Sequence, residues 1–413
     1  MPDPVKPDIS ALIRLLGPGI ADLLSGREIE LEHVTLEFSE LELQIPLSVP
    51  LPVQNPGIVS GTHPPSFTGK IPDSLISETF FAEPETYSSR IREVTIGGTR
   101  SEGGSRGRSI TVGGSSSLPF SQPEHPPAHP PVISLDVFDT KISMPKVLRA
   151  HLGDVMDDPA AWAKLNVEKF GADMVTIHLI STDPLIQDKS PREASRTVEE
   201  VLQAVDVPII IGGCGDPKKD AATFIEISAM AEGEGLLLNS VTSDMAEVKT
   251  LEPVCKAASE SGHCLLGFTG LDLNNAKELN RRIYPHFPPD RLLMDLTTVA
   301  LGYGLEYSFS IHERARLSAL MGDTELQHPT LSACTNAWSA REAWMNLGPG
   351  FGSVDLRGPL WESIGGITLL LAGVDLFLMM HPLAVSTMRE VSSRLMNPGM
   401  PESHGADWVS AKI

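Results

Sequence analysis

The chain has 413 residues, of which 41% are hydrophobic, and it carries a formal net charge of −21. This length provides one large domain or two smaller ones with a sizeable core. The strongly negative charge repels the phosphates of nucleic acids and of anionic membranes, so both classes of partner are disfavoured. We therefore expect a cytoplasmic protein whose acidity serves solubility or docking against basic partners.

The N-terminal region divides into two segments of different composition. Residues 1–46, the N-terminal extension, contain the helix-like run ISALIRLLGPGIADLL. They also contain IELEHVTLEFSELELQI, which alternates apolar and acidic residues as a half-exposed strand does. We interpret its acidic face as solvated surface. Residues 47–90 are rich in Pro, Ser, Thr and Gly, which predicts a linker.

Residues 91–130 contain two similar runs, REVTIGGTR and RSITVGGSS, on either side of the loop SEGGSRGR. Each run is short, β-branched and ends in Gly-Gly, which predicts a β-hairpin with turns that need positive φ. The loop lacks the lysine signature of a phosphate-binding loop, so phosphate binding is not predicted there. The Pro-rich PEHPPAHPPV that follows is expected to be an extended lead-in.

From residue 131 onwards, short apolar runs alternate with amphipathic helical patterns. The apolar runs begin near residues 132, 173, 208, 236, 264, 292, 330 and 376. Eight strand–helix units predict a (β/α)8 TIM barrel over residues 131–400, with residues 401–413 as a C-terminal tail. A doubly wound open sheet is the alternative, but the even spacing and the closing helix favour a closed barrel.

One apolar stretch, residues 364–385, is long enough to cross a bilayer. Asp375 lies in its middle, and Ala372-Gly373 divides it into a helix-like and a strand-like half. A buried helix, a tight turn and a buried strand are therefore the preferred interpretation.

The carboxyl ends of the predicted strands carry polar side chains that would meet on the functional face of a barrel. They include Thr140, Ser181, Thr182, Asp216, Thr242 and Trp338. The residues that we expect to contact a cofactor are Asp139, His178, Gly213, Cys214, Asn239, Thr269, Asp295, Thr297, Thr298, Tyr303, Asn336 and His381. Such a ring of hydroxyls, amides and two acids suits an extended polar cofactor or a pterin, whose ring edge pairs with Asp and Asn.

Several other chemistries find little support in this ring. His178 and His381 end the second and eighth strands, but the first strand has no HxH and no carboxylate follows His381, so we interpret both as hydrogen-bonded histidines. No lysine ends a strand, as a Schiff-base enzyme would need. The end of the eighth strand has no glycine for a phosphate site. No catalytic residue and no metal ligand is assigned.

The cysteines also give no indication of a metal site. They are Cys214, Cys255, Cys264 and Cys334, and no two form a CxxC pair. A local zinc or iron–sulfur site and a disulfide framework are both disfavoured, so reduced thiols are expected. We interpret Cys214 as a small, partly buried thiol rather than a soft metal ligand. The start of the chain, MPDPV, shows no secretory signal.

Six motifs, five of them long, resemble a known family. They are VTIGGTRSEGGSRGRSITVGG followed by LPF, PVISLDVFD, VPIIIGGCGDPKKD, LGYGLEYSFSIHERARLSALMGD and RGPLWESIGGITLLLAGVDLFLMMHP. In this order they resemble the small subunit of the corrinoid iron–sulfur protein. Its archaeal counterpart is the delta subunit of the acetyl-CoA decarbonylase/synthase complex. The resemblance covers roughly residues 90 to 398.

The resemblance implies a TIM barrel that pairs with a large subunit carrying a [4Fe–4S] cluster and a corrinoid-binding domain. The corrinoid would lie between that domain and the barrel. It would receive a methyl group from a methyltetrahydropterin and deliver it to acetyl-CoA synthase, in the Wood–Ljungdahl pathway. The implied transient partners are a methyltetrahydropterin methyltransferase and acetyl-CoA synthase. The cofactor would then supply the chemistry and this chain the enclosure.

The sequence departs from the family pattern at two places. The family reads GLGYGIEYSFS where this chain reads TTVALGYGLEYSFS, with Val299-Ala300 at the position of expected glycines. Met380 stands where the family has Arg, so any contact of that Arg with a propionamide or the partner must be made otherwise.

Two alternatives remain open. The first is a self-sufficient pterin-binding methyltransferase, in which Asp139, Asn239 and Asp295 hold the pterin and an acid protonates N5. The second is a scaffold whose acidic N-terminal segment organises a larger complex.

Overall fold

The computed structural model describes residues 86–120 and 127–397. The predicted extension, most of the predicted linker and the predicted tail therefore lie outside the described residues. All the described residues belong to one compact unit.

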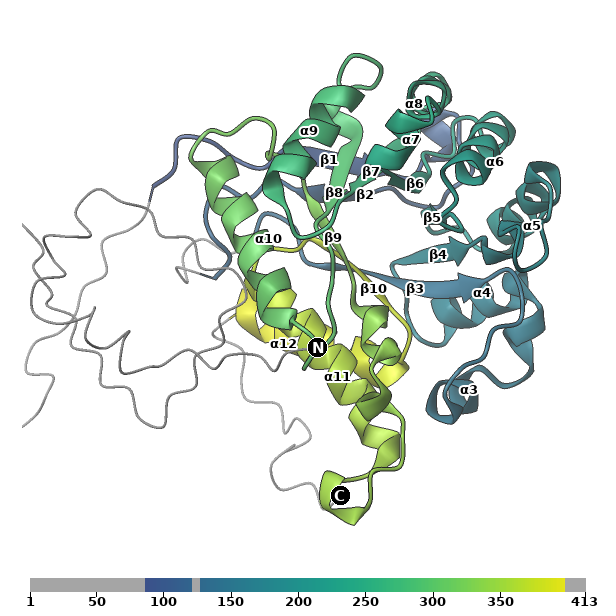
Figure 1. Cartoon of the computed structure of the whole chain (residues 1–413), viewed down its shortest axis with the longest axis vertical. Coiled ribbons are helices and arrows are strands. Elements are labelled where there is room, and N and C mark those ends of the chain that lie inside the picture. The colour runs from purple at the N-terminus through teal and green to yellow at the C-terminus, as the bar shows by residue number, and fades with distance from the viewer. Residues whose placement is uncertain (1–85, 121–126, 398–413) are drawn as a thin grey trace, which may run out of the picture. The chain divides into compact units, whose positions relative to one another are not determined.

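Eight parallel strands close into a barrel, with β10 pairing with both β9 and β3 (Figure 1). The strands are β3 (Val132–Phe138), β4 (Met174–His178), β5 (Ile209–Gly212), β6 (Leu237–Val241), β7 (Cys264–Phe268), β8 (Leu292–Asp295), β9 (Thr330–Ala333) and β10 (Leu376–Met379). This arrangement confirms the predicted (β/α)8 barrel and excludes the open sheet.

Helices surround the barrel (Figure 1). They are α3 (Lys146–Leu152), α4 (Pro159–Glu168), α5 (Pro191–Ala204), α6 (Pro217–Met230), α7 (Ser243–Glu247), α8 (Leu251–Glu260), α9 (Leu273–Ile283), α10 (Leu305–Leu320), α11 (Val354–Leu371) and α12 (Pro382–Met396). Short 3-10 helices are η1 (Arg100–Glu102), η2 (Gly153–Asp157), η3 (Ile180–Thr182), η4 (Pro289–Arg291), η5 (Cys334–Ser339), η6 (Arg341–Ala343) and η7 (Pro349–Phe351).

Several helices begin in the same way, with a polar cap followed by proline. Asp158, Ser190 and Asp216 accept backbone N–H bonds at the starts of α4, α5 and α6, and each precedes a proline. The cap satisfies free N–H groups, and proline at the first helical position has its φ already set. These starts fix where each helix leaves the carboxyl end of its strand.

The strands are buried on both faces. Their outward side chains pack against the helices, whereas inward ones such as Met174, Ile210 and Leu293 fill the barrel. Inside the barrel, Ser134 and Thr176 share a buried hydrogen bond of 2.7 Å. Near-continuous apolar strands are expected when helices cover a parallel sheet.

A β-hairpin closes the amino-terminal end of the barrel. It consists of β1 (Glu93–Ile96) and β2 (Ile110–Gly113), which pair antiparallel as predicted. Val94, Ile96 and Val112 pack with the lowest inward side chains of the barrel. Since one end is filled by this hairpin, the other end is the one available for binding.

The apolar stretch at residues 364–385 forms the second half of α11, a turn and the buried strand β10, as expected, and its last four residues begin α12. Among the described residues, no helix is both long and apolar enough to cross a membrane.

Candidate functional site

Eleven of the twelve residues expected to contact a cofactor follow or end strands at the same end of the barrel, which we call the mouth, and Asn239 lies two residues before the end of β6. Their exposure differs. Asp139, Thr269, Asp295, Thr298 and His381 are buried, and Tyr303 and Asn336 are exposed. The remaining five, His178, Gly213, Cys214, Asn239 and Thr297, are half-buried. The structure thus brings the predicted set to one face but engages several of its members in contacts within the protein.

Asp139 joins the connections after β3 and β4. One carboxylate oxygen accepts the backbone N–H of Ser181 at 2.9 Å, and the other accepts the Ser181 hydroxyl. Burial raises the pKa of Asp139, and the bonds from Ser181 partly offset this rise. Asp139 therefore orders the mouth, with its oxygens already engaged by the protein.

Asp136 lies just below this point, and the sequence reading did not select it. Its side chain is 1% exposed, and Oδ1 lies 3.2 Å from Nε2 of His178. Neither oxygen has a hydrogen bond of good geometry among the described residues. The sequence does contain a pattern that indicates its position. Side chains alternate between the two faces of a strand, so Asp136 in VISLDVF lies on the same, inward side as Ser134.

His178 is held by this carboxylate and by an aromatic neighbour. Its ring stacks on Phe138 with centroids 4.8 Å apart and planes at 19°. Burial alone would lower the pKa of His178, but the charge and hydrogen bonding of Asp136, with a contribution from Asp139, raise it overall. The Asp136 carboxylate therefore stabilises the imidazolium form of His178 against the cost of its burial.

The stretch after β8 folds back on itself. Asp295 accepts the N–H of Thr297 at 2.8 Å, and burial raises the pKa of Asp295 to about 7. Thr297 adopts a φ of 80°, and its hydroxyl donates to the carbonyl of Thr269. The hydroxyl of Thr298 lies 2.9 Å from that of Ser332, and its carbonyl accepts the Asn336 amide. Most polar groups of this stretch are therefore hydrogen-bonded within the protein, and Asp295 is its titratable group.

The connection after β5 is organised by Asp220 in α6. Its two oxygens accept the N–H groups of Cys214 and Gly215 at 2.7 and 2.9 Å. A Cβ on Gly213 would lie 2.4 Å from this carboxylate, so only glycine fits there. Burial raises the pKa of the Cys214 thiol, which favours the neutral thiol over a thiolate ligand.

His381 and Glu362 fix the connection after β10. Glu362 is fully buried in α11 and accepts N–H bonds from Met380 at 2.6 Å, from His381 at 3.1 Å and from the Trp338 indole at 3.0 Å. Nδ1 of His381 accepts the N–H of Leu383 and so caps α12. Its Nε2 has no partner among the described residues. Glu362 was missed because its partners are distant in sequence.

Glu362 gives a testable dependence of stability on pH. Burial raises its pKa from 4.5 to about 8. The folded protein then keeps a proton that the unfolded chain releases, so its contribution to stability is complete below about pH 4.5. That contribution falls as the pH rises to about 8, by at most about 1.4 kcal/mol per pH unit. We expect Glu362→Gln to make the fall shallower in urea unfolding between pH 5 and 9.

The matched control for this prediction is Glu313→Gln, which changes an exposed glutamate of α10 and should leave the slope unchanged. Equal slopes for wild type and Glu362→Gln would contradict the raised pKa.

Several large exposed apolar side chains lie in the connections at the mouth end of the barrel. Tyr303, Tyr307 and Phe351 are 58%, 64% and 61% exposed, and Leu185 is 94% exposed. We call the full set the apolar rim: Leu185, Ile186, Phe268, Leu271, Tyr303, Tyr307, Trp344, Met345 and Phe351. All nine lie at strand carboxyl ends, in the connections that follow them or in the first turn of α10. Their concentration at one end of the barrel makes that end the candidate interaction surface.

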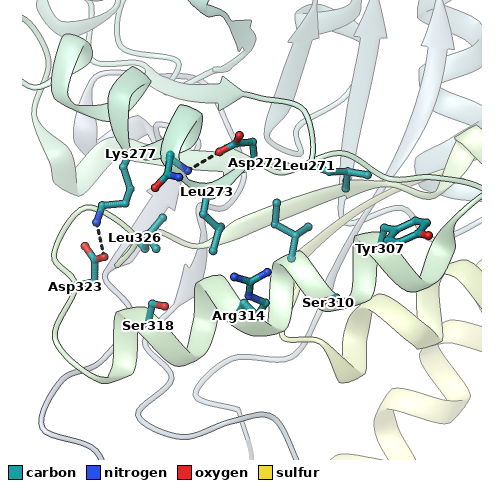
Figure 2. Close-up of a pocket in the computed structure, with 12 residues that line it drawn as sticks. Leu271, Asp272, Leu273, Lys277, Tyr307, Ser310, Arg314, Ser318, Asp323 and Leu326 are labelled. Carbon is teal, nitrogen blue, oxygen red and sulfur yellow. Dashed lines mark hydrogen bonds and ion pairs between the residues drawn. The ribbon is translucent and has the colours of Figure 1, made fainter. Parts of the chain in front are cut away.

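A groove with a volume of about 480 Å3 runs down the outer wall between α9 and α10. Figure 2 shows Arg314 pointing from α10 into it, while Lys277 pairs with Asp323 at 2.8 Å. The groove shares Leu271 and Tyr307 with the apolar rim, but none of the twelve predicted residues lines it. It is therefore separate from the mouth.

Within residues 86–120 and 127–397, no group of three His, Cys, Asp or Glu side chains has an arrangement that could hold a metal ion. The four cysteines are free, and burial raises the pKa of Cys255, Cys264 and Cys334 to about 12. The fold and the mouth together define a barrel protein that offers hydrogen-bonding groups and an apolar contact surface.

Comparison with known proteins gives a family. Residues 93–388 match the family described as CO dehydrogenase/acetyl-CoA synthase delta subunit. The acetyl-CoA decarbonylase/synthase complex subunit delta of Archaeoglobus fulgidus is 47% identical over 333 residues, covering 79% of this chain and 73% of the relative. That of Methanocaldococcus jannaschii is 42% identical over 409 residues, covering 97% and 96%. The chain belongs to this delta-subunit family.

A solved structure of similar fold is the dihydropteroate synthase of Xanthomonas albilineans in complex with 7,8-dihydropteroate. It is 15% identical with a TM-score of 0.45, covering 66% of this chain and 95% of the other.

Proposed function

We propose that this chain is the barrel subunit of a heterodimeric corrinoid iron–sulfur methyl carrier. In this role it covers a corrinoid held by a large partner subunit during methyl transfer between a methyltetrahydropterin and acetyl-CoA synthase. Family membership supports a place in the acetyl-CoA decarbonylase/synthase complex, since the relatives are named as its subunit delta.

The observation that carries this proposal is the apolar rim around a polar mouth. Exposed aromatic side chains such as Tyr307 and Phe351 cost solvation free energy unless a partner covers them, and aromatic residues are enriched at protein interfaces. The buried hydrogen-bonding groups inside the rim would remain without hydrogen-bond partners under a purely apolar partner. A partner that brings a large polar group to the mouth satisfies both features.

The residues present fit a corrinoid, which is broad and fringed with amide groups. Unsatisfied buried polar atoms occur at the mouth on Asp136, on Thr269 and on Nε2 of His381. Half-buried Asn239 and His178 also belong to this end of the barrel. The corrinoid, when bound, supplies the metal that carries the methyl group. The chain's own residues would hold the polar edge of the corrinoid and keep water away. No lysine that could act as a Schiff-base nucleophile ends a strand, so the chemistry is assigned to the cofactor.

The test is co-expression with a large subunit that carries a corrinoid domain and a four-cysteine cluster motif. We expect a 1:1 complex with a corrinoid absorbance band, and weak or no corrinoid binding by this chain alone. A colourless, monomeric chain after co-purification would contradict the proposal.

Calorimetry of the isolated chain with methyltetrahydrofolate and with methyltetrahydromethanopterin provides the contrary arm. Micromolar binding that is lost in Asp295→Ala would instead favour a self-sufficient pterin methyltransferase.

A further inference from the structure

Asp136 has an environment that its structural role does not explain. Its side chain is 1% exposed, and neither oxygen has a hydrogen bond of good geometry among the described residues. A buried carboxylate without hydrogen bonds is costly, and such groups concentrate at functional sites. The nearest group of opposite charge is the ring of His178, with 3.2 Å between Oδ1 and Nε2. Asp136 is therefore placed to hold His178 in its protonated form.

The other nitrogen of His178 faces a different environment. Nε2 is sealed from solvent beside Asp136, whereas 21% of the His178 side chain remains exposed. Nδ1 lies against Gly212, where a Cβ would approach it to 2.9 Å. No hydrogen bond to Nδ1 occurs among the described residues. Phe138 stacks on the ring and fixes its plane. In the protonated ring, Nδ1–H is thus a donor without a partner at the mouth.

From this geometry we infer that Asp136 and His178 form a proton-holding pair whose free Nδ1–H binds an acceptor oxygen of the group seated over the mouth. The acceptor is an amide carbonyl or a phosphate oxygen, since both accept strong bonds from a charged donor. Asp136 acts through His178 and is a positioning residue. This inference rests on the proposed function for the identity of the bound group, but the pair itself can be tested in the chain alone.

The charged groups that act on His178 are Asp136 on β3 and Asp139 just after it, and both favour the imidazolium. Its other close neighbours, the Phe138 ring and Gly212 of β5, carry no charge. Replacing Asp136 by Asn leaves burial as the main influence, and burial lowers the pKa. The state of His178 is therefore set mainly by one carboxylate.

The first measurement is the pKa of His178 in the full chain, by NMR of histidine-labelled protein. We expect a value above 6.5 in wild type and below 6.5 in Asp136→Asn. A wild-type value at or below 6.5, or one that Asp136→Asn does not change, would overturn the inference whatever the chain binds.

The second measurement is retention of corrinoid by the co-expressed complex during buffer exchange at several pH values. As the pH rises through the pKa of His178, we expect dissociation to accelerate about 10- to 100-fold, the effect of losing one charged hydrogen bond. His178→Asn keeps an N–H donor near the Nδ1 position without titrating. It should remove the part of the pH dependence that His178 causes, while the titration of Asp295, whose pKa burial raises to about 7, remains in both proteins. Identical pH profiles for this variant and wild type would overturn the inference.

Gly212→Ala places a methyl group against Nδ1 without altering the charges, so it should weaken retention while the pKa of His178 stays raised. Gly365→Ala is the matched control, because a Cβ there meets nothing within 4 Å.

Cobinamide, which has amides but no nucleotide phosphate, and cobalamin, which has both, distinguish the acceptors. A pH effect with both identifies the amide, and an effect with cobalamin alone identifies the phosphate. A wild-type complex without corrinoid would overturn the proposed function and this binding role together, while the titration would still report on the pair.

Discussion

Replacing Arg106 by alanine is expected to destabilise the protein by about 3–5 kcal/mol, the cost of removing one partner of a buried charged network. Arg106 is 2% exposed and lies in the long loop between β1 and β2. Its guanidinium donates to Glu234 at 2.7 Å and to the carbonyls of Val205 and Leu202 at 2.6 and 2.7 Å. Without it, these acceptors lose a donor and the loop loses a side-chain link to the base of the barrel.

Arg108→Ala is the matched control, because this arginine lies in the same loop with a side chain that is 53% exposed. Its closest acidic atom, in Asp173, is 3.7 Å away. A loss of less than about 1 kcal/mol is expected for it. Arg106→Lys should recover little, since an ammonium group cannot reproduce the guanidinium fork. Urea unfolding followed by circular dichroism measures all three, and equal midpoints for Arg106→Ala and Arg108→Ala would contradict the prediction.

A backbone contact supports the same anchoring role. Gly98, in this loop, approaches the carbonyl of Gly233 so closely that an added Cβ would lie 1.8 Å from the oxygen. The N–H of Gly98 donates to the carbonyl of Glu234 at 2.8 Å. The loop thus approaches the barrel backbone to backbone, which explains the glycines that the sequence placed there. It serves the base of the barrel, at the opposite end from the mouth.

The barrel could be predicted from the sequence because its signal is local. Each strand is a short apolar run with polar residues at its carboxyl end. Asp295 is the last residue of β8, and His381 lies two residues after β10. The hairpin was equally visible from its β-branched runs and paired glycines. Alternation and turn chemistry act within a few residues, so their consequences can be read without knowing the tertiary contacts.

The interior of the mouth could be predicted only in part, because contacts between distant residues decide it. Asp139 and Thr298 stand at strand ends as expected, yet their oxygens are largely engaged by Ser181 and Ser332. Asp136 was overlooked within an apolar run. Glu362 is in the middle of a helix, and its role follows only from contacts with residues 18 to 24 positions away. No local pattern reports such pairings.

The exposure of the apolar rim is also invisible in the sequence, and it gives the second prediction of large effect. Tyr307→Asp should weaken assembly with the large subunit about 30-fold or more, the effect of losing an interface residue worth 2 kcal/mol. Tyr307 lies in the first turn of α10 and is 64% exposed. An aspartate there would place a charge in an apolar contact, in a chain whose net charge is already −21.

The matched control lies at the other end of the same helix. Met321 directly follows α10, on the side where strands begin, and is 70% exposed. Met321→Asp adds the same charge to an equally accessible site, so an effect of net charge alone would weaken assembly in both variants. Surface plasmon resonance or co-purification with the large subunit separates the two. If only Tyr307→Asp fails to assemble, the partner covers the end of α10 that lies at the mouth. Equal binding by both variants would place the partner elsewhere and leave the apolar rim without its proposed role.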